Sequence, residues 1–158
     1  IISSILIQGT TITISVDGDN PPYLYALDND SFQTSNVFTN VSLGPHVVYV
    51  RPLQADCNIV SKEFSIINIV NTITPNGDGI NDRLDLSHLY LKENPSFIIY
   101  DRFGMIVFEG TPANQYIWDG KKNGKPLKTD SYWYDIQWTE PHTENTQRYT
   151  SWILLKNK

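Results

Sequence analysis

The sequence contains a series of short runs rich in β-branched and aromatic residues, each closed by turn residues. In residues 11–16 the alternation is strict, with Ile12, Ile14 and Val16 on one face. Comparable runs occupy residues 23–27, 37–41, 46–51, 59–67, 96–100, 105–109, 132–140 and 148–155. Short strands spaced by turn signals, without a helical period, predict an all-β chain of the β-sandwich type.

The runs fall into two groups, separated by a segment of almost pure turn chemistry at residues 74–82. We therefore expect two tandem β-sandwich modules, one over residues 1–70 and one over residues 71–158. Residues 86–94 are the one stretch expected to be briefly helical. Residues 101–104 are expected to join two strands as a hairpin connection, and residues 119–127 to form a long loop.

Composition excludes several classes of function. The net charge is −5 in 158 residues, so the chain lacks the excess of basic residues that a nucleic-acid-binding domain carries. No apolar run approaches the roughly 20 residues that span a bilayer. Residues 1–5 lack the basic start and cleavage region of a signal peptide. We therefore expect the chain to be part of a longer protein.

The last two strands differ in pattern. In residues 132–140, Tyr132, Tyr134, Ile136 and Trp138 share one face. The final strand is apolar on both faces, because Ile153 and Leu155 alternate with Trp152 and Leu154. Such a strand is either covered on both sides or meets a partner, and it lies close to the C-terminus.

No catalytic pattern stands out. His46, His88 and His142 are far apart in the sequence, and no nucleophile elbow, zinc-protease helix or phosphate loop is present. Cys57 is the single cysteine, so it forms no internal disulfide and is expected to be a small buried residue. We predict that the chain is not an enzyme.

The sharpest local motif is residues 76–82, in which oxygen-bearing side chains alternate around glycines. Asn76, Asp78 and Asp82 resemble part of a calcium loop, where hard oxygen ligands converge on a flexible turn. Strands rather than helices flank the motif, and Thr74 is a poor first ligand. A network of Asx turns explains the same residues, and we favour it; a structural calcium ion is the alternative.

Two further groups of residues carry two interpretations each. Lys121, Lys122, Lys125 and Lys128 form either a solvated basic loop or a docking patch for an acidic partner. The four tryptophans are either core residues or a stacking platform for sugars, and Trp133 is the one whose exposure matters most. These tryptophans are Trp118, Trp133, Trp138 and Trp152.

From residue 73 onward the chain resembles a known family. The motifs, in the family's order, are residues 74–82, 99–104, 118–120, 123–127 and 132–134. They resemble the gliding-motility-associated C-terminal domain of Bacteroidota, the type B sorting domain of the type IX secretion system. Phe103 stands where the family commonly has Trp. Residues 21–27, 32–38 and 43–50 resemble, more loosely, segments of the immunoglobulin-like repeats of giant adhesins, in which Cys57 has a precedent. The resemblance implies that the all-β chain consists of two tandem immunoglobulin-like β-sandwich modules, with an adhesin repeat over residues 1–70.

This resemblance implies a function. The C-terminal module would be a sorting signal that directs a large surface adhesin from the periplasm through the outer-membrane type IX machinery to the cell surface. The expected partners are that machinery and an outer-membrane β-barrel protein, reached in part by strand addition at the C-terminal edge. The residues predicted to bind the partner are Arg102, Phe103, Gly104, Trp118, Asp119, Gly120, Asn123, Gly124, Lys125, Trp152, Ile153, Leu154 and Leu155.

Two alternatives come from other classes of function. One is a carbohydrate- or calcium-dependent adhesive binding module, which would present exposed aromatic rings or gain stability from calcium. The other is a structural spacer, for which removal of residues 72–158 would leave export unchanged.

Overall fold

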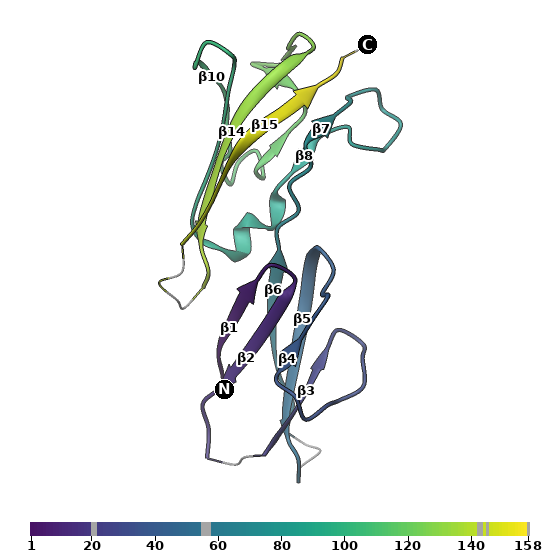
Figure 1. Ribbon diagram of the computed structural model, residues 1–158, viewed down its shortest axis with the longest axis vertical. Coiled ribbons are helices and arrows are strands. Elements are labelled where there is room, and N and C mark those ends of the chain that lie inside the picture. Colours follow the sequence, from purple (N-terminus) through teal and green to yellow (C-terminus); the bar gives the residue numbers. More distant parts are fainter. Residues whose placement is uncertain (20–21, 55–57, 142–143, 145, 158) are drawn as a thin grey trace. The chain divides into compact units, whose positions relative to one another are not determined.

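The computed structural model describes residues 1–19, 22–54, 58–141, 144 and 146–157 (Figure 1). Cys57, which was predicted to be a small buried residue, and His142 lie outside these residues. The chain divides into two compact units, Ile1–Ile67 with Glu140–Glu144, and Asn68–Thr139 with Asn145–Lys158. The regular elements of both units are strands, apart from one short 3-10 helix in the second unit, so the all-β prediction is confirmed. Within the described residues, no helix is long and apolar enough to cross a membrane.

The first unit packs two three-stranded sheets around one core. One sheet has the order β1-β2-β4, from Ile2–Gln8, Thr11–Val16 and Val37–Phe38. The other has the order β3-β5-β6, from Tyr23–Leu27, Gly44–Pro52 and Val60–Ile66. The core cluster draws on both sheets and on Val41 in the β4–β5 connection, and consists of Ile2, Ile5, Ile12, Ile14, Leu27, Val41, Val48, Val50, Phe64 and Ile66. This is the layered packing of a sandwich.

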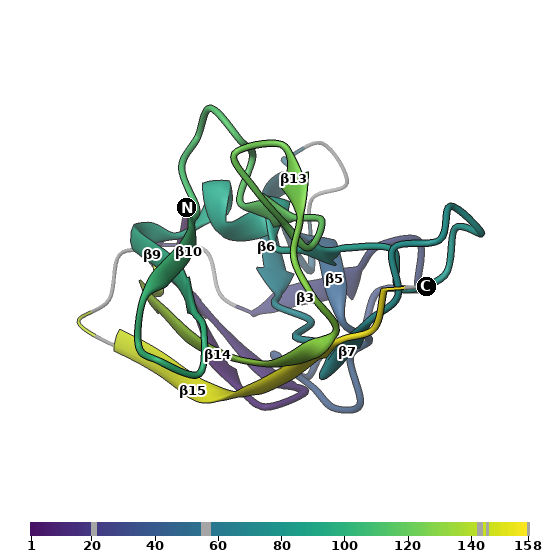
Figure 2. The ribbon, with the colours of Figure 1, turned by 90° about the horizontal axis from the view of Figure 1, so that it is seen from above.

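The second unit is organised by a five-stranded sheet of order β10-β9-β14-β15-β7. Its strands are β7 Thr72–Ile73, β9 Glu93–Tyr100, β10 Ile106–Glu109, β14 Asp130–Thr139 and β15 Thr146–Leu155. In Figure 2, β14 lies between β9 and β15. All pairs are antiparallel except β15 with β7, which run parallel. The two longest pairs, β14 with β15 and β14 with β9, therefore set the register at the centre of the sheet.

Smaller elements complete the second unit. Strand β8 (Leu84–Asp85) pairs with β11 (Ile117–Trp118), and β12 (Lys121–Lys122) pairs with β13 (Lys125–Pro126). The short helix expected within residues 86–94 is a 3-10 helix, η1, at Ser87–Leu91.

Alternation along β14 separates the core from the outer surface. Tyr132, Tyr134, Ile136 and Trp138 are all buried, which confirms the predicted shared face. The other buried apolar residues of the unit are Ile73, Leu84, Leu86, Leu89, Phe97, Ile99, Val107, Tyr116, Trp118, Ile153 and Leu155. The opposite face of the sheet remains partly exposed to solvent.

Several elements differ from the sequence-based prediction, including the short strands β7 and β8, which were not predicted. Strand β1 at Ile2–Gln8 was not predicted, although Ile2 and Ile5 on it are buried in the first unit. Residues 119–127 were predicted as a long loop, but they contain the β12–β13 hairpin. Its two turn residues, Asn123 and Gly124, have φ of 50° and 77°, as a two-residue turn with two positive-φ positions requires.

Candidate partner-binding surfaces

The β9–β10 connection presents an exposed aromatic tip. The Asp101 carboxylate accepts hydrogen bonds from the backbone N–H groups of Phe103 and Met105, both at 2.9 Å. Gly104 closes the turn with φ of 78°, and its N–H donates to the Asp101 carbonyl oxygen. Because the turn is held from within, the Phe103 side chain projects outward and is 76% exposed. The Arg102 guanidinium lies 4.9 Å from the centre of the Phe103 ring and 3.8 Å from Asp130.

The β12–β13 hairpin presents a polar surface over a buried tryptophan. Asp119 accepts a hydrogen bond from the Lys121 ammonium at 2.7 Å, and the residues Asn123, Gly124 and Lys125 are exposed. Trp118 was predicted to contact a partner, but it is fully buried and packs edge-on against Tyr132. Its indole N–H donates to the Lys121 carbonyl oxygen, so Trp118 holds the hairpin in place rather than forming the surface.

The last strand offers only half of its predicted residues to a partner. Ile153 and Leu155 are fully buried, because they point into the core of the unit. Trp152 and Leu154 point to the other face and are 51% and 39% exposed. The apolar residues on this outer face therefore remain open to solvent, and a strand covered on both faces is the wrong interpretation of this pattern.

Register places four apolar side chains in one row across the outer face of the sheet. Ile106 on β10 pairs with Tyr100 on β9, Tyr100 pairs with Trp133 on β14, and Trp133 pairs with Trp152 on β15. Residues directly opposite one another in a sheet share a face. We call these four residues the outer row. The rings of Trp133 and Trp152 meet edge to face, with centres 5.1 Å apart.

The outer row changes the interpretation of the tryptophans. Trp118 and Trp138 are buried, as core residues should be. Trp152 is exposed on the outer face and Trp133 beside it is half-buried, and their ring planes cross at 78°. A flat sugar-stacking platform needs coplanar rings, so this pair does not provide one. Its apolar surface instead continues toward Tyr100 and Ile106, which fits a protein partner.

The loop at residues 76–82 is held together by one carboxylate. Asp82 accepts backbone hydrogen bonds from Asn76, Gly77 and Gly79 at 2.8 to 3.0 Å. The bonds from Gly77, Gly79 and Asn76 lower the pKa of Asp82 below its ordinary value. Asp78 in turn accepts the Ile80 N–H at 2.8 Å. These contacts form a network of Asx turns, the interpretation favoured from the sequence.

The same geometry bears on the calcium alternative. Each of the side-chain oxygens of Asn76, Asp78 and Asp82 accepts an N–H from within the loop. A cation needs several of those oxygens facing one point, so it would have to displace part of this network. Side-chain oxygens of this kind are suitable ligands for calcium, but here they are arranged to accept N–H groups of the loop.

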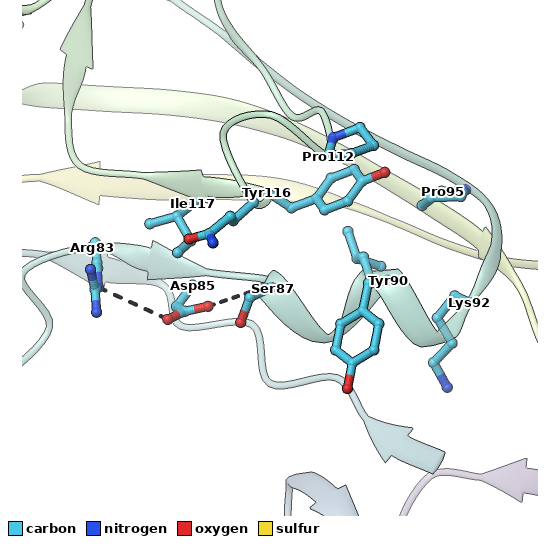
Figure 3. A pocket seen from close by; sticks show the side chains of 11 residues that line it. Arg83, Asp85, Ser87, Tyr90, Lys92, Pro95, Pro112, Tyr116 and Ile117 are labelled. Carbon is cyan, nitrogen blue, oxygen red and sulfur yellow. Dashed lines mark hydrogen bonds and ion pairs between the residues drawn. The ribbon is translucent and has the colours of Figure 1, made fainter. Parts of the chain in front are cut away.

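A groove that the sequence analysis missed lies between η1 and the loop at residues 112–117 (Figure 3). It has a volume of about 800 Å³. Tyr116 and Pro112 form one wall and Tyr90 stands on the opposite side, as Figure 3 shows. Asp85 lies at one end of the groove, 3.9 Å from Arg83. The groove combines aromatic and hydrogen-bonding side chains, as small-ligand sites do.

An unusual backbone builds the wall of this groove. Gln115 and Tyr116 are consecutive non-glycine residues in the left-handed region, with φ of 56° and 55°. Each such residue costs on the order of 1–2 kcal/mol. The Asn114 side chain holds the turn by accepting the backbone N–H groups of Thr111 and Tyr116. Sequence reasoning had no signal for this conformation beyond the Pro112–Asn114 turn composition.

Gly120 connects the hairpin to the end of the last strand. A Cβ at this position would lie 2.6 Å from a Leu155 methyl carbon and 3.3 Å from Pro75 Cγ. Gly124, in the same hairpin, has the same φ of 77° but open space around it. The two glycines therefore form a matched pair, differing in contact with the C-terminal strand.

We predict that Gly120→Ala destabilises the protein more than Gly124→Ala does. Both variants place Ala at positive φ, which costs about 1–2 kcal/mol. Only Gly120→Ala also forces Leu155 to move, which adds about 1–3 kcal/mol of overpacking. Urea unfolding of the two variants measures the difference. Equal losses in the free energy of unfolding would mean that the close approach of Gly120 to Leu155 does not limit the size of the residue at position 120.

A second prediction concerns pH. Ionised Asp82 has a lowered pKa in the folded protein, so its contribution to stability is present above pH 3.8 and is lost as the pH falls through the lowered value. Asp82→Asn is expected to reduce the free energy of unfolding at neutral pH, and the deficit should shrink as the pH falls below 3.8. Denaturant unfolding between pH 2 and pH 7 measures it. Asp119→Asn, which removes a carboxylate bonded to a lysine side chain, is the control.

The same proteins test the calcium alternative. Because the loop oxygens already accept N–H groups, we expect the melting temperature to be the same in calcium and in a chelator. A calcium-dependent rise in melting temperature that Asp82→Asn abolishes would instead establish a structural calcium site.

Comparison with known protein families matches residues 67–155 to the CHU_C type IX secretion signal domain. The match covers more than half of the 158 residues and begins within one residue of the start of the second unit at Asn68. The sequence-based assignment of the C-terminal domain is thereby confirmed, and the match does not extend over the predicted adhesin repeat. Comparison with curated proteins found no match. The chain belongs to the CHU_C type IX secretion signal domain family, and its second unit is a type IX secretion signal that implies export from the cell.

Proposed function

We propose that the second unit sorts a large surface adhesin through the outer-membrane type IX machinery and delivers it to the cell surface. The observation that carries this proposal is the family match, which spans nearly the whole second unit. In this proposal the first unit is an immunoglobulin-like adhesin repeat that belongs to the cargo. Its two three-stranded sheets around one core are compatible with that assignment.

We propose that the partner is the type IX machinery together with an outer-membrane β-barrel protein. The described surfaces suited to such a partner are the Phe103 tip, the β12–β13 hairpin and the outer row. Phe103 is 76% exposed, Met105 61% and Ile106 47%, so apolar side chains gather at one end of the sheet. Exposed apolar groups in this density are typical of protein-binding surfaces.

We also propose that the chain is not an enzyme. Among the residues that the structure describes, Asp28, His46 and Ser42 in the first unit resemble a catalytic triad. His46 Nδ1 lies 2.7 Å from the Asp28 carboxylate, but Nε2 lies 2.8 Å from the Ser42 carbonyl oxygen. The carbonyl oxygen can only accept, and the Ser42 hydroxyl oxygen lies farther from Nε2, at 3.3 Å. This arrangement favours a hydrogen bond from Nε2 to the carbonyl oxygen over transfer of the hydroxyl proton. His46 also stacks on Phe64 and is buried, which supports a structural role.

The sorting proposal predicts that export depends on the second unit. The full chain, preceded by a signal peptide and a fluorescent reporter, is expressed in a gliding bacterium with a working type IX system and the partner barrel. We expect the reporter at the surface or in the medium. Deletion of residues 148–158 should trap it in the periplasm, since this removes most of β15, as fractionation would reveal.

Two controls separate sorting from other roles. A host without the translocon should retain the reporter in the periplasm even with the intact chain. A spacer role would be supported instead if deletion of residues 72–158 left export unchanged. Periplasmic retention of the intact chain in the competent host would overturn the sorting proposal.

A second candidate function is supported by the groove in Figure 3. Tyr90 is 66% exposed on one side of it and the largely buried Tyr116 lines the other, while Arg83, Asp85 and Gln115 supply hydrogen-bonding groups. Aromatic faces beside polar groups suit a saccharide. We propose this as an adhesive role additional to sorting.

This candidate predicts binding on a glycan array by the full chain, with at least a tenfold loss in Tyr90→Ala. Tyr149→Ala is the matched control, because Tyr149 is 46% exposed on β15 and does not line the groove. An array without signal, or equal loss in both variants, would remove the saccharide proposal and leave the sorting proposal intact.

A further inference from the structure

The two edges of the five-stranded sheet differ in how well they are protected against the addition of another strand. At one edge, β10 is only four residues long and its pairing with β9 is interrupted by a register shift between Ile106 and Phe108. The Lys122 ammonium caps that edge by donating to the Ile106 carbonyl oxygen at 2.9 Å. Short length, irregular register and a lysine are the usual means by which proteins prevent strands from adding to a sheet edge.

The other edge lacks these protections. Strand β15 is ten residues long, and it pairs with β14 over its whole length without a register shift. It contains no lysine and no proline, and its one charged residue, Arg148, is engaged by Asp135 at 2.7 and 3.1 Å. The neighbouring strand β7 covers only Leu154 and Leu155.

The hydrogen bonds to β7 show which backbone groups point outward. The Leu154 N–H donates to the Asn71 carbonyl oxygen and the Lys156 N–H to that of Ile73, so these residues face away from β14. Backbone groups alternate in direction along a strand, so those of Trp152, Thr150 and Arg148 also face away from β14. In the part of the chain that the structure describes, these three have no backbone partner on that side.

The side chains next to this edge indicate which residue types an added strand would carry. Trp152, at the end of the outer row, is 51% exposed, and Thr150 and Arg148 are exposed on the same face. A strand added beside β15 would place one of its residues opposite Trp152 and so extend the outer row by one position. An apolar or aromatic residue there would cover the tryptophan ring.

We propose that the β15 edge at residues 148–152 is the docking site for an extended strand of the export partner, with an apolar residue opposite Trp152. This inference rests on the proposed sorting function and deepens it, because it assigns the binding mode. A second copy of the chain is a poorer occupant. Pairing two such edges would join about five residues on each side, whereas stable interfaces use about 20–30.

The test replaces Thr150 in the full-length reporter fusion. Thr150→Pro removes an N–H that points away from β14, so the β14–β15 hydrogen bonds remain, while the proline ring blocks an incoming strand. Thr150→Ala removes the same side chain and keeps the N–H, which makes it the matched control. We expect Thr150→Pro to lower surface export at least tenfold and Thr150→Ala to export like the parent.

Purified full-length variants are checked for folding by thermal melting. If Thr150→Pro fails to fold, Thr150→Lys decides the matter, because it places a charge beside the edge without changing the backbone. Parent-like export by a folded Thr150→Pro, or by Thr150→Lys in that case, would overturn the strand-docking inference alone. Failure of the parent fusion to reach the surface would overturn the sorting proposal instead. A parent dimer that Thr150→Pro converts to monomer would identify a second copy as the occupant and also overturn the inference.

Discussion

The second unit depends on strand β14. Tyr132, Tyr134, Ile136 and Trp138 on its inner face lie at the centre of the core, where Tyr132 packs against the fully buried Trp118. Because β14 pairs on one side with β9 and on the other with β15, its register also determines which outer residues become neighbours. The same strand thus organises the core and aligns Tyr100, Trp133 and Trp152 on the surface.

Loops of the unit are tied to the end of this sheet by close contacts. Gly120 lies so near Leu155 and Pro75 that no side chain fits there without a shift. This places the β12–β13 hairpin, the last strand and the beginning of the 76–82 loop against one another. The Asp82 carboxylate then holds that loop through three backbone N–H groups, which needs no contribution from the core.

Much of the fold followed from local patterns, whereas the surface did not. Alternation identified the buried face of β14, and turn residues located the β9–β10 connection. The Asn123–Gly124 pair was itself a strong hairpin signal that the prediction of a long loop overlooked. Alternation alone could not tell whether Trp152 was covered, because that depends on which elements pack against the outer face. The outer row depends on register between strands far apart in the sequence, which no local pattern contains.

This dependence on register has a consequence for the proposed recognition. Each residue of the outer row comes from a different strand, and the four are neighbours only when β10, β9, β14 and β15 are paired in register. The free edge of β15 likewise needs β14 to direct half of its backbone groups outward. A partner that binds both the outer row and the β15 edge therefore recognises the folded unit rather than a linear peptide. On the proposed binding mode, the signal is complete only once the second unit has folded, so an unfolded chain would not display it.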